Sequence, residues 1–294
     1  MFFYRNGICI NCQRYSYRKL FLGEYTKMMT KISSSQLEIG DFIVNRIGLG
    51  TNRIVNDERS INALKNAVGM GINFIDTASA YTGGVSEEVI GNTLSLFSNI
   101  LVATKGGMVA PDFHIDALPE TLEKQLKESL KKLKLDAIPL YFLHRVDPNV
   151  PIKESLLFLK EMQNKGKIKH IGLSQVTIEQ IEEAREYIDV VAVENEYNLS
   201  ARMYEDVIDY AEKEKIIFLP FFPLHFNKSH FQILENLKEK YHATDEQIAL
   251  AWLLKRSPII LPIPGSLSKE HLRENIEALK INLSEEDYQE LFTS

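Results

Sequence analysis

The sequence predicts an α/β fold, a (β/α)8 TIM barrel with an N-terminal β-hairpin and an extra C-terminal helix. From Arg46 onward, eight short runs rich in Val, Ile, Leu and Phe alternate with amphipathic segments. Near-continuous apolar runs are typical of parallel strands buried on both faces, and the alternation with helices favours a closed barrel. The length of 294 residues also suits one such barrel, which typically takes ~250 residues.

The eight strands are expected where the apolar runs end in turns or polar residues. They span 47–50, 74–76, 100–104, 138–143, 168–173, 190–193, 216–221 and 259–261. Pro262 and Pro264 directly follow the last run. Because proline has no backbone N–H to donate to a ladder, we expect the eighth strand to be short.

Between the strands, apolar residues recur at helical spacing. In the first helix Ile61, Leu64 and Val68 fall on neighbouring turns, and Gly71 is placed to end it. Pro119 stands near the start of another helix, where its missing N–H costs little. The predicted helices are 58–70, 86–96, 118–133, 153–164, 178–187, 203–214, 230–241, 245–255 and 269–279.

Two elements lie outside the alternation. Residues 37–46 hold Gly40 and Asp41 between two alternating segments, which predicts a hairpin that plugs one end of the barrel. Residues 284–292 predict a final helix with Ser284 as its N-cap. We therefore expect residues 31–294 to form a single barrel domain.

The first 30 residues differ from the rest in being basic, aromatic and without clear periodicity. We interpret residues 1–30 as a tail or an over-extended start rather than a targeting peptide, since no compact apolar stretch precedes a small-residue cleavage site. Cys9 and Cys12 form a C-x-x-C pair here. No second cysteine or histidine pair stands nearby to complete a zinc site, so we interpret them as incidental thiols.

The bulk composition limits the partners. A net charge of -6 gives no support for nucleic-acid binding, and no apolar run approaches the ~18 residues that would cross a bilayer. The histidines form no H-x-H or H-E-x-x-H pattern, so no metal site is expected. With cysteine confined to the tail, we predict a cytoplasmic protein, and a monomer is the default expectation.

Four polar residues follow the tips of the second, third and fourth strands: Asp76, Tyr81, Lys105 and His144. In a barrel of this type the active site lies at the C-terminal ends of the strands, so these side chains are expected to meet. A tyrosine pKa of about 10 is high for an acid, and a nearby ammonium would lower it. Tyr81 could then protonate a carbonyl oxygen while a nicotinamide cofactor delivers hydride to the carbon.

Several separated segments resemble the aldo-keto reductase family, over essentially the whole chain from about Leu37. They are 71–78 with Tyr81, 103–107, 143–148, 166–174, and 263–266 running on to Asn275. The resemblance implies an NAD(P)H-dependent reduction of an aldehyde or ketone to an alcohol. Tyr81 would be the general acid, Lys105 would tune it, Asp76 would support Lys105, and His144 would orient the substrate.

The resemblance also implies a cofactor that lies across the barrel mouth without a Rossmann fold. The matching positions are Ser174, Gln175, Glu194, Phe221, Leu224, Gly265, Ser266, His271 and Asn275. A 2′-phosphate needs a cation near Ser266, and Lys269, His271 and Arg273 stand close in sequence. We therefore expect NADPH, with NADH as the alternative.

Three residues depart from the family pattern. Gln175 replaces an asparagine, Glu194 a glutamine, and Phe222 a small serine. An ionised Glu194 can accept from a carboxamide but cannot donate to its oxygen, and Gln175 is the candidate for that donor. The departures keep open an alternative on the same fold, a cofactor-binding regulatory or sensor subunit with little turnover. A barrel isomerase or hydrolase that uses no nicotinamide is a further rival.

Overall fold

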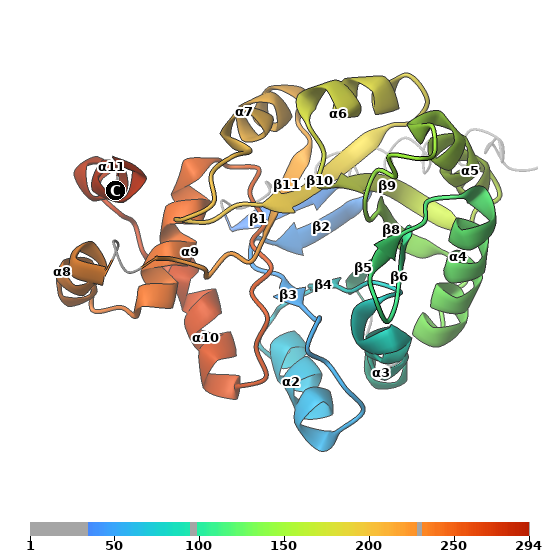
Figure 1. Cartoon of the computed structure of the whole chain (residues 1–294). Coiled ribbons are helices and arrows are strands. Elements are labelled where there is room, and N and C mark those ends of the chain that lie inside the picture. The colour runs from blue at the N-terminus through green and yellow to red at the C-terminus, as the bar shows by residue number, and fades with distance from the viewer. Residues whose placement is uncertain (1–34, 95–98, 228–230, 294) are drawn as a thin grey trace, which may run out of the picture. The chain divides into compact units, whose positions relative to one another are not determined.

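The computed structural model describes residues 35–94, 99–227 and 231–293. The predicted tail of residues 1–30, including Cys9 and Cys12, lies outside the described residues. Within the described part, strands form an inner ring and helices surround it, as Figure 1 shows. The predicted fold class is confirmed.

Seven strands form one parallel sheet that curves into the barrel wall. In spatial order they are β3 (Leu49–Gly50), β4 (Phe74–Asp76), β5 (Leu101–Gly106), β8 (Ile138–Leu143), β9 (Ile168–Ser174), β10 (Val190–Glu196) and β11 (Ile217–Phe221). Every neighbouring pair is parallel. All seven coincide with predicted strands, because continuous burial on both faces gives each one an uninterrupted apolar run.

The predicted eighth strand, 259–261, is reduced to one bridge between Ile260 and Phe218. The segment still closes the ring through its carbonyl groups. The amides of Gly48 and Gly50 donate to the carbonyls of Pro262 and Pro264 at 2.9 and 3.4 Å. Prolines can accept but not donate, so the barrel closes here without a regular strand.

Helices cover the outside of the ring. They are α2 (Glu58–Gly69), α3 (Val85–Leu94), α4 (Pro119–Leu133), α5 (Ile152–Asn164), α6 (Ile178–Arg185), α7 (Glu205–Glu214), α8 (Phe231–Tyr241), α9 (Asp245–Arg256) and α10 (Lys269–Glu277), with short 3-10 turns η1 (Tyr81–Gly84) and η3 (Ala278–Lys280). Pro119 occupies the first turn of α4, as predicted. The helix predicted from 203 begins at Glu205 instead. A small hairpin, β6 (Met108–Val109) with β7 (His114–Ile115), was not predicted.

The N-terminal hairpin pairs β1 (Gln36–Ile39) with β2 (Phe42–Asn45). Its buried residues Leu37, Ile39 and Val44 share one apolar cluster with Phe74 and Leu101, which begin β4 and β5. The hairpin therefore plugs the N-terminal end of the barrel, as predicted, and it lies behind the ring in the view of Figure 1. The opposite end stays open.

The chain ends in the predicted extra helix, α11 (Glu285–Thr293). The amide of Asp287 donates to the Ser284 hydroxyl at 3.1 Å, the expected N-cap contact. Tyr288 and Phe292 pack beside Trp252 of α9, so α11 is held by an aromatic cluster. No helix in the described ranges is long and apolar enough to span a bilayer.

Candidate active site

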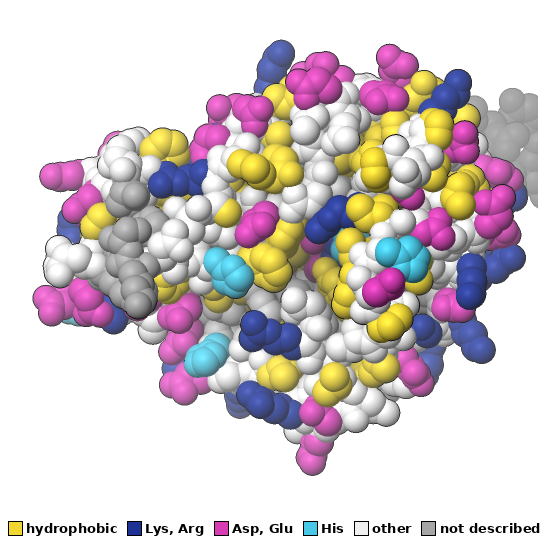
Figure 2. All heavy atoms as spheres, in the orientation of Figure 1, with side chains coloured by type: hydrophobic (Ala, Val, Ile, Leu, Met, Phe, Trp, Pro, Cys, Tyr) yellow, Lys and Arg dark blue, Asp and Glu magenta, His cyan; other side chains and the backbone are white. Residues whose placement is uncertain are grey.

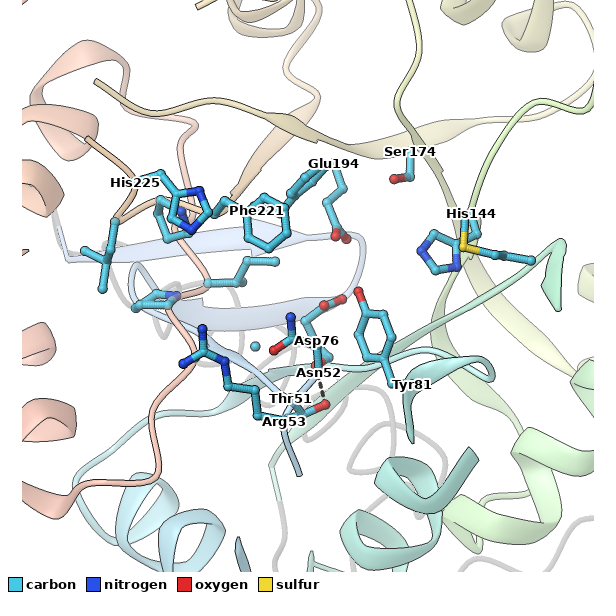
Figure 3. Close-up of a pocket in the computed structure, with 18 of the residues that line it drawn as sticks. Thr51, Asn52, Arg53, Asp76, Tyr81, His144, Ser174, Glu194, Phe221 and His225 are labelled. Atoms are coloured by element: carbon cyan, nitrogen blue, oxygen red, sulfur yellow. Dashed lines mark hydrogen bonds between the residues drawn. The ribbon is translucent and has the colours of Figure 1, made fainter. Parts of the chain in front are cut away.

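The C-terminal ends of the strands surround a cavity of about 440 Å³. Figure 2 shows this face, where hydrophobic, basic and histidine side chains surround a central hollow. Asp76, Tyr81, His144, Ser174 and Glu194 line it. In Figure 3 the side chains of Asp76, Tyr81 and Glu194 converge on one point. Three parallel strands, the residue that follows a fourth, and one 3-10 turn thus contribute polar groups to a single site.

Lys105 lies beneath this point and is fully buried. Its Nζ donates to both carboxylate oxygens of Asp76 at 2.6 Å, and to the Thr77 carbonyl at 3.0 Å. It lies 3.4 Å from the Tyr81 hydroxyl and 3.2 Å from Glu194 Oε2. The structure therefore brings three of the four predicted residues into one hydrogen-bonded group.

Sheet register explains the Asp76–Lys105 contact. Asp76 pairs with Ala103 across β4 and β5, and side chains two residues apart in a strand share a face. Lys105 consequently points to the same side as Ala103, which belongs to the inner core of the barrel. A long side chain at that position reaches back to the strand-end carboxylate.

Tyr81 is presented by a tight turn. Its amide donates to the Ala78 carbonyl at 3.1 Å, and Thr82, Gly83 and Gly84 all have positive φ. The turn leads straight into α3. The two glycines adopt these positive φ values without steric cost, which allows the tight turn after Tyr81.

Buried hydroxyl groups, which sequence reasoning missed, hold this region together. Thr51 Oγ1 donates to the Asp76 carbonyl at 2.7 Å. Ser86 Oγ donates to Thr51 Oγ1 at 2.9 Å and lies 2.9 Å from Thr77 Oγ1. These hydrogen bonds connect the ends of β3 and β4 with α3, so they fix the strand end that carries Asp76. Isolated hydroxyl residues give no distinctive spacing in the sequence.

The electrostatics of Tyr81 differ from the expectation of a lowered pKa. Burial raises the pKa of Tyr81 most strongly, Lys105 lowers it, and the carboxylates of Asp76 and Glu194 raise it, so the net shift is upward. Burial also lowers the pKa of Lys105, but Asp76 and Glu194 outweigh this and raise it above its usual value. Near neutral pH the site therefore holds a protonated phenol beside a charged ammonium.

His144 stands edge-on to Tyr81, with ring centroids 5.9 Å apart. Burial, followed by the charges of Lys105 and Arg145, lowers the pKa of His144 well below its ordinary value. The imidazole is neutral, so it offers one N–H donor and one acceptor. Its Nδ1 finds no hydrogen-bond partner among the described residues. The fourth predicted residue thus lies beside the phenol as a neutral donor.

Five of the residues predicted to hold the cofactor line the same cavity. They are Ser174, Glu194, Phe221, Leu224 and Gly265. Arg145, which sequence reasoning did not select, donates to Ser174 Oγ at 3.1 Å and to the His144 carbonyl at 2.7 Å. The aromatic ring of Phe221 and the polar side chains of Ser174 and Glu194 therefore line the same part of the cavity.

A second cavity of about 370 Å³ adjoins the first at Gly50, Arg53 and Gly265. The predicted residues Ser266 and His271 line it. Arg53 and Arg59 line it too and were not selected from the sequence, because both precede the second strand and lie far along the chain from Ser266. Lys269 and Arg273, the expected cations, are outside this lining.

Two predicted cofactor residues are placed elsewhere. Gln175 lines neither cavity, and its side-chain oxygen accepts from the Tyr204 hydroxyl at 2.7 Å. Asn275 is buried on α10 and also lines neither. The third departure, Phe222, is exposed at the mouth and stacks on His225 with ring centroids 4.8 Å apart. The oxygen of Gln175 is therefore already engaged away from the cavity.

The lining residues fit a nicotinamide dinucleotide. The central cavity offers the Phe221 ring and buried polar groups, including His144, whose Nδ1 has no hydrogen-bond partner among the described residues. The adjoining cavity offers two arginines and a histidine, which suit phosphate. A molecule with a polar aromatic head and a phosphorylated tail matches this sequence of environments.

Comparison with known proteins agrees with a site for a nicotinamide dinucleotide. A model described as the aldo/keto reductase family matches residues 46–292. The chain is 37% identical to an uncharacterized oxidoreductase of Schizosaccharomyces pombe, covering 90% of this chain and 92% of the relative. It is 37% identical to pyridoxine 4-dehydrogenase of Escherichia coli, covering 87% and 96%. An aldo-keto reductase from Klebsiella pneumoniae, solved with NADPH, superimposes with a TM-score of 0.73 at 26% identity, covering 85% and 90%.

Proposed function

The chain belongs to the aldo/keto reductase family, and from this premise we propose that it reduces an aldehyde or ketone to an alcohol with NADPH. The observation that carries the proposal is the Lys105 group, in which one buried ammonium contacts Asp76 and Tyr81 at the mouth of the barrel. A reduced nicotinamide, when bound, supplies hydride to the carbonyl carbon.

In this proposal Tyr81 donates its phenolic proton to the carbonyl oxygen. The raised pKa of Tyr81 keeps that proton in place until the oxygen gains negative charge. Lys105, 3.4 Å from the hydroxyl, then stabilises the phenolate that forms. The neutral His144 donates a hydrogen bond to the same oxygen and holds the carbonyl in line.

The Tyr81→Phe variant tests the assignment. Because the ring is retained, we expect its melting temperature to stay close to that of the wild type while kcat for an aldehyde falls by about 10²- to 10⁴-fold. NADPH consumption measures turnover, and Tyr210→Phe, on the outer helix α7, is the matched control. Full turnover by Tyr81→Phe would reject the role of Tyr81.

The regulatory or sensor alternative predicts a different result. The wild-type protein would then bind NADPH, detected by quenching or shift of nicotinamide fluorescence, yet fail to consume it with any carbonyl in a panel. No change in that fluorescence would favour the isomerase or hydrolase rival.

For the substrate, we propose aromatic aldehydes of about the size of pyridoxal. Phe221, Phe222, His225 and Met108 line the central cavity, so its mouth offers rings for stacking. A relative at 37% identity is named pyridoxine 4-dehydrogenase. Comparison of kcat/KM for pyridoxal, an aliphatic aldehyde and methylglyoxal tests this choice; a higher value for the aliphatic aldehyde would contradict it.

The proposed preference for NADPH over NADH rests on the cations of the adjoining cavity. Removing one phosphate contact with Arg59→Gln is expected to raise the Kd of NADPH about tenfold, equivalent to about 1.4 kcal/mol, with little effect on NADH. Arg273→Gln, outside this cavity, is the control. Equal weakening of both cofactors would contradict recognition of a 2′-phosphate by Arg59.

The cytoplasmic location, the monomeric state and the single domain over residues 31–294 stay predictions. Light scattering of the purified chain tests the second. Limited proteolysis tests the third, since a domain that begins near residue 31 should persist after the preceding residues are cleaved.

A further inference from the structure

Lys105 faces a second carboxylate that the proposed mechanism does not use. Ala192 of β10 belongs to the inner core of the barrel, and Glu194, two residues on, points inward as well. Glu194 is buried, and its Oε2 lies 3.2 Å from Lys105 Nζ. One ammonium therefore serves two carboxyl groups and a phenol.

The two carboxyl groups are not equivalent. Asp76 has both oxygens at 2.6 Å from Lys105, whereas Glu194 has one at 3.2 Å. Burial, and then the Asp76 charge, raise the pKa of Glu194 to about 8, although Lys105 and Arg145 oppose the shift. Burial raises the pKa of Asp76 as well, but both of its oxygens contact the ammonium, so we assign the proton taken up as pH falls to the more weakly held Glu194.

We propose that Glu194 is a positioning residue whose protonation state controls how strongly Lys105 assists proton donation by Tyr81. The charged groups that face Glu194 are Asp76 on β4, Lys105 on β5 and Arg145 after β8, and Tyr81 on η1 faces it as a neutral phenol. When Glu194 is neutral, the negative charge of Asp76 and the positive charge of Lys105 cancel. With Glu194 ionised, the three-residue group carries one negative charge, which makes Tyr81 hold its proton more tightly.

This inference rests on the proposed function and predicts a specific pH profile. As pH rises through the titration of Glu194 near 8, kcat of the wild type for carbonyl reduction should fall on the order of tenfold. This fall corresponds to a rise of about one unit in the pKa of Tyr81. Glu194→Gln stays neutral at every pH, so this fall should be absent. The measurement uses saturating substrate and compares NADPH with NADPH that is deuterated at the transferred hydrogen. A deuterium isotope effect on kcat shows that the chemical step is being observed.

Glu196→Gln is the matched control. It removes a carboxylate from the same strand, two residues away, at a position that lines a different cavity. We expect this variant to keep the fall of the wild type. Infrared difference spectra between about pH 6.5 and 9.5 supply a readout without turnover. Protonated-carboxyl absorption should decrease as pH rises, and the decrease should be smaller in Glu194→Gln, because burial also raises the pKa of Glu87 and Asp76.

The outcomes separate the two proposals. If Tyr81→Phe loses turnover but Glu194→Gln keeps the same pH-dependent fall as the wild type, the role of Glu194 is overturned while the proposed function stands. If Tyr81→Phe keeps turnover, the proposed function fails, and the infrared comparison still decides whether Glu194 holds a proton. Equal decreases in the wild type and Glu194→Gln overturn the inference. Should Glu194→Gln fail to fold, Glu87→Gln removes the other buried glutamate among the described residues, and a decrease that survives in this variant keeps the inference, whereas its loss overturns it.

Discussion

At the residue scale, the site depends on a single buried cation. Replacing Lys105 with Met leaves Asp76 and Glu194 buried without their shared counter-charge. We expect loss of turnover and a decrease of about 3 kcal/mol in the free energy of unfolding, because breaking a buried pair leaves an uncompensated charge. Urea denaturation measures the stability.

Two further variants test this cause. Lys127→Met, which removes a solvent-exposed partner of Glu123, should cost less than about 1 kcal/mol. Adding Asp76→Asn to Lys105→Met should restore part of the lost stability, since the carboxylate that lost its closest counter-charge is then removed. A Lys105→Met protein as stable as the wild type would show that the ion pairs contribute nothing net.

Sequence reasoning reached the part of the site that strand ends determine. Asp76, Lys105 and His144 each follow an apolar run, so their common location could be predicted from barrel geometry alone. The Glu194–Lys105 contact could not be, because it depends on how far β10 brings a side chain across the ring. Arg59 was missed for a similar reason: α2 reaches the cavity through tertiary packing that no local pattern encodes.

At the element scale, the N-terminal hairpin is a plug with two distinct faces. Ile39 is buried in the inner core, whereas Ile43 on the facing strand is 45% exposed. Ile39→Ala should lower the free energy of unfolding by about 2–5 kcal/mol, because it opens a cavity between the hairpin and the barrel. Ile43→Ala, the same chemical change, should cost less than about 0.5 kcal/mol. Equal effects in denaturant melts would mean that the hairpin packs no core.

Helix α3 packs on β5 through a buried carboxyl. Thr104 Oγ1 donates to Glu87 Oε1 at 2.7 Å, and Glu87 Oε2 has no partner among the described residues. Burial raises the pKa of Glu87, although the hydrogen bond from Thr104 opposes the shift. The folded chain therefore binds this proton more tightly than the unfolded chain, and stability is lost as pH rises from the unfolded pKa through the folded one.

Glu87→Gln should remove that loss. We expect the variant to be more stable than the wild type in mildly alkaline buffer by about 1 kcal/mol or more, and to lose this advantage near pH 5. Melting temperatures across the pH range measure the difference. The exposed neighbour Glu88 supplies the control, and a Glu88→Gln profile that matched Glu87→Gln would remove burial as the cause.

The elements themselves were predicted well where burial pattern decides them and poorly where backbone chemistry intervenes. Seven strands coincide with apolar runs. The eighth run is as apolar as the others, but the prolines that follow it offer β3 carbonyl contacts only. The hairpin of β6 and β7 was missed because strands of two residues each are too short to show alternation.

At the scale of the whole molecule, the one join of the barrel in the described residues that lacks a regular strand coincides with the proposed cofactor site. The ring closes between β3 and residues 259–264 through the amides of Gly48 and Gly50. The second of these contacts, from the Gly50 amide to the Pro264 carbonyl, is long at 3.4 Å. Gly50 and Gly265, on the two sides of this join, line both cavities. A ligand spanning the two cavities would therefore contact both edges and hold them together.

Binding of NADPH should then stabilise the molecule unevenly. At a concentration of about 100 times its Kd, a ligand specific for the folded state adds about 2.7 kcal/mol to the free energy of unfolding. Hydrogen exchange followed by mass spectrometry should show the largest slowing in peptides covering residues 47–52 and 259–266, whose opening the ligand opposes directly. Peptides from β8 and β9, on the other side of the ring, should slow less. Equal slowing throughout the barrel would mean that the join opens only when the whole domain unfolds, and that the proline-containing segment is no weaker than a regular strand.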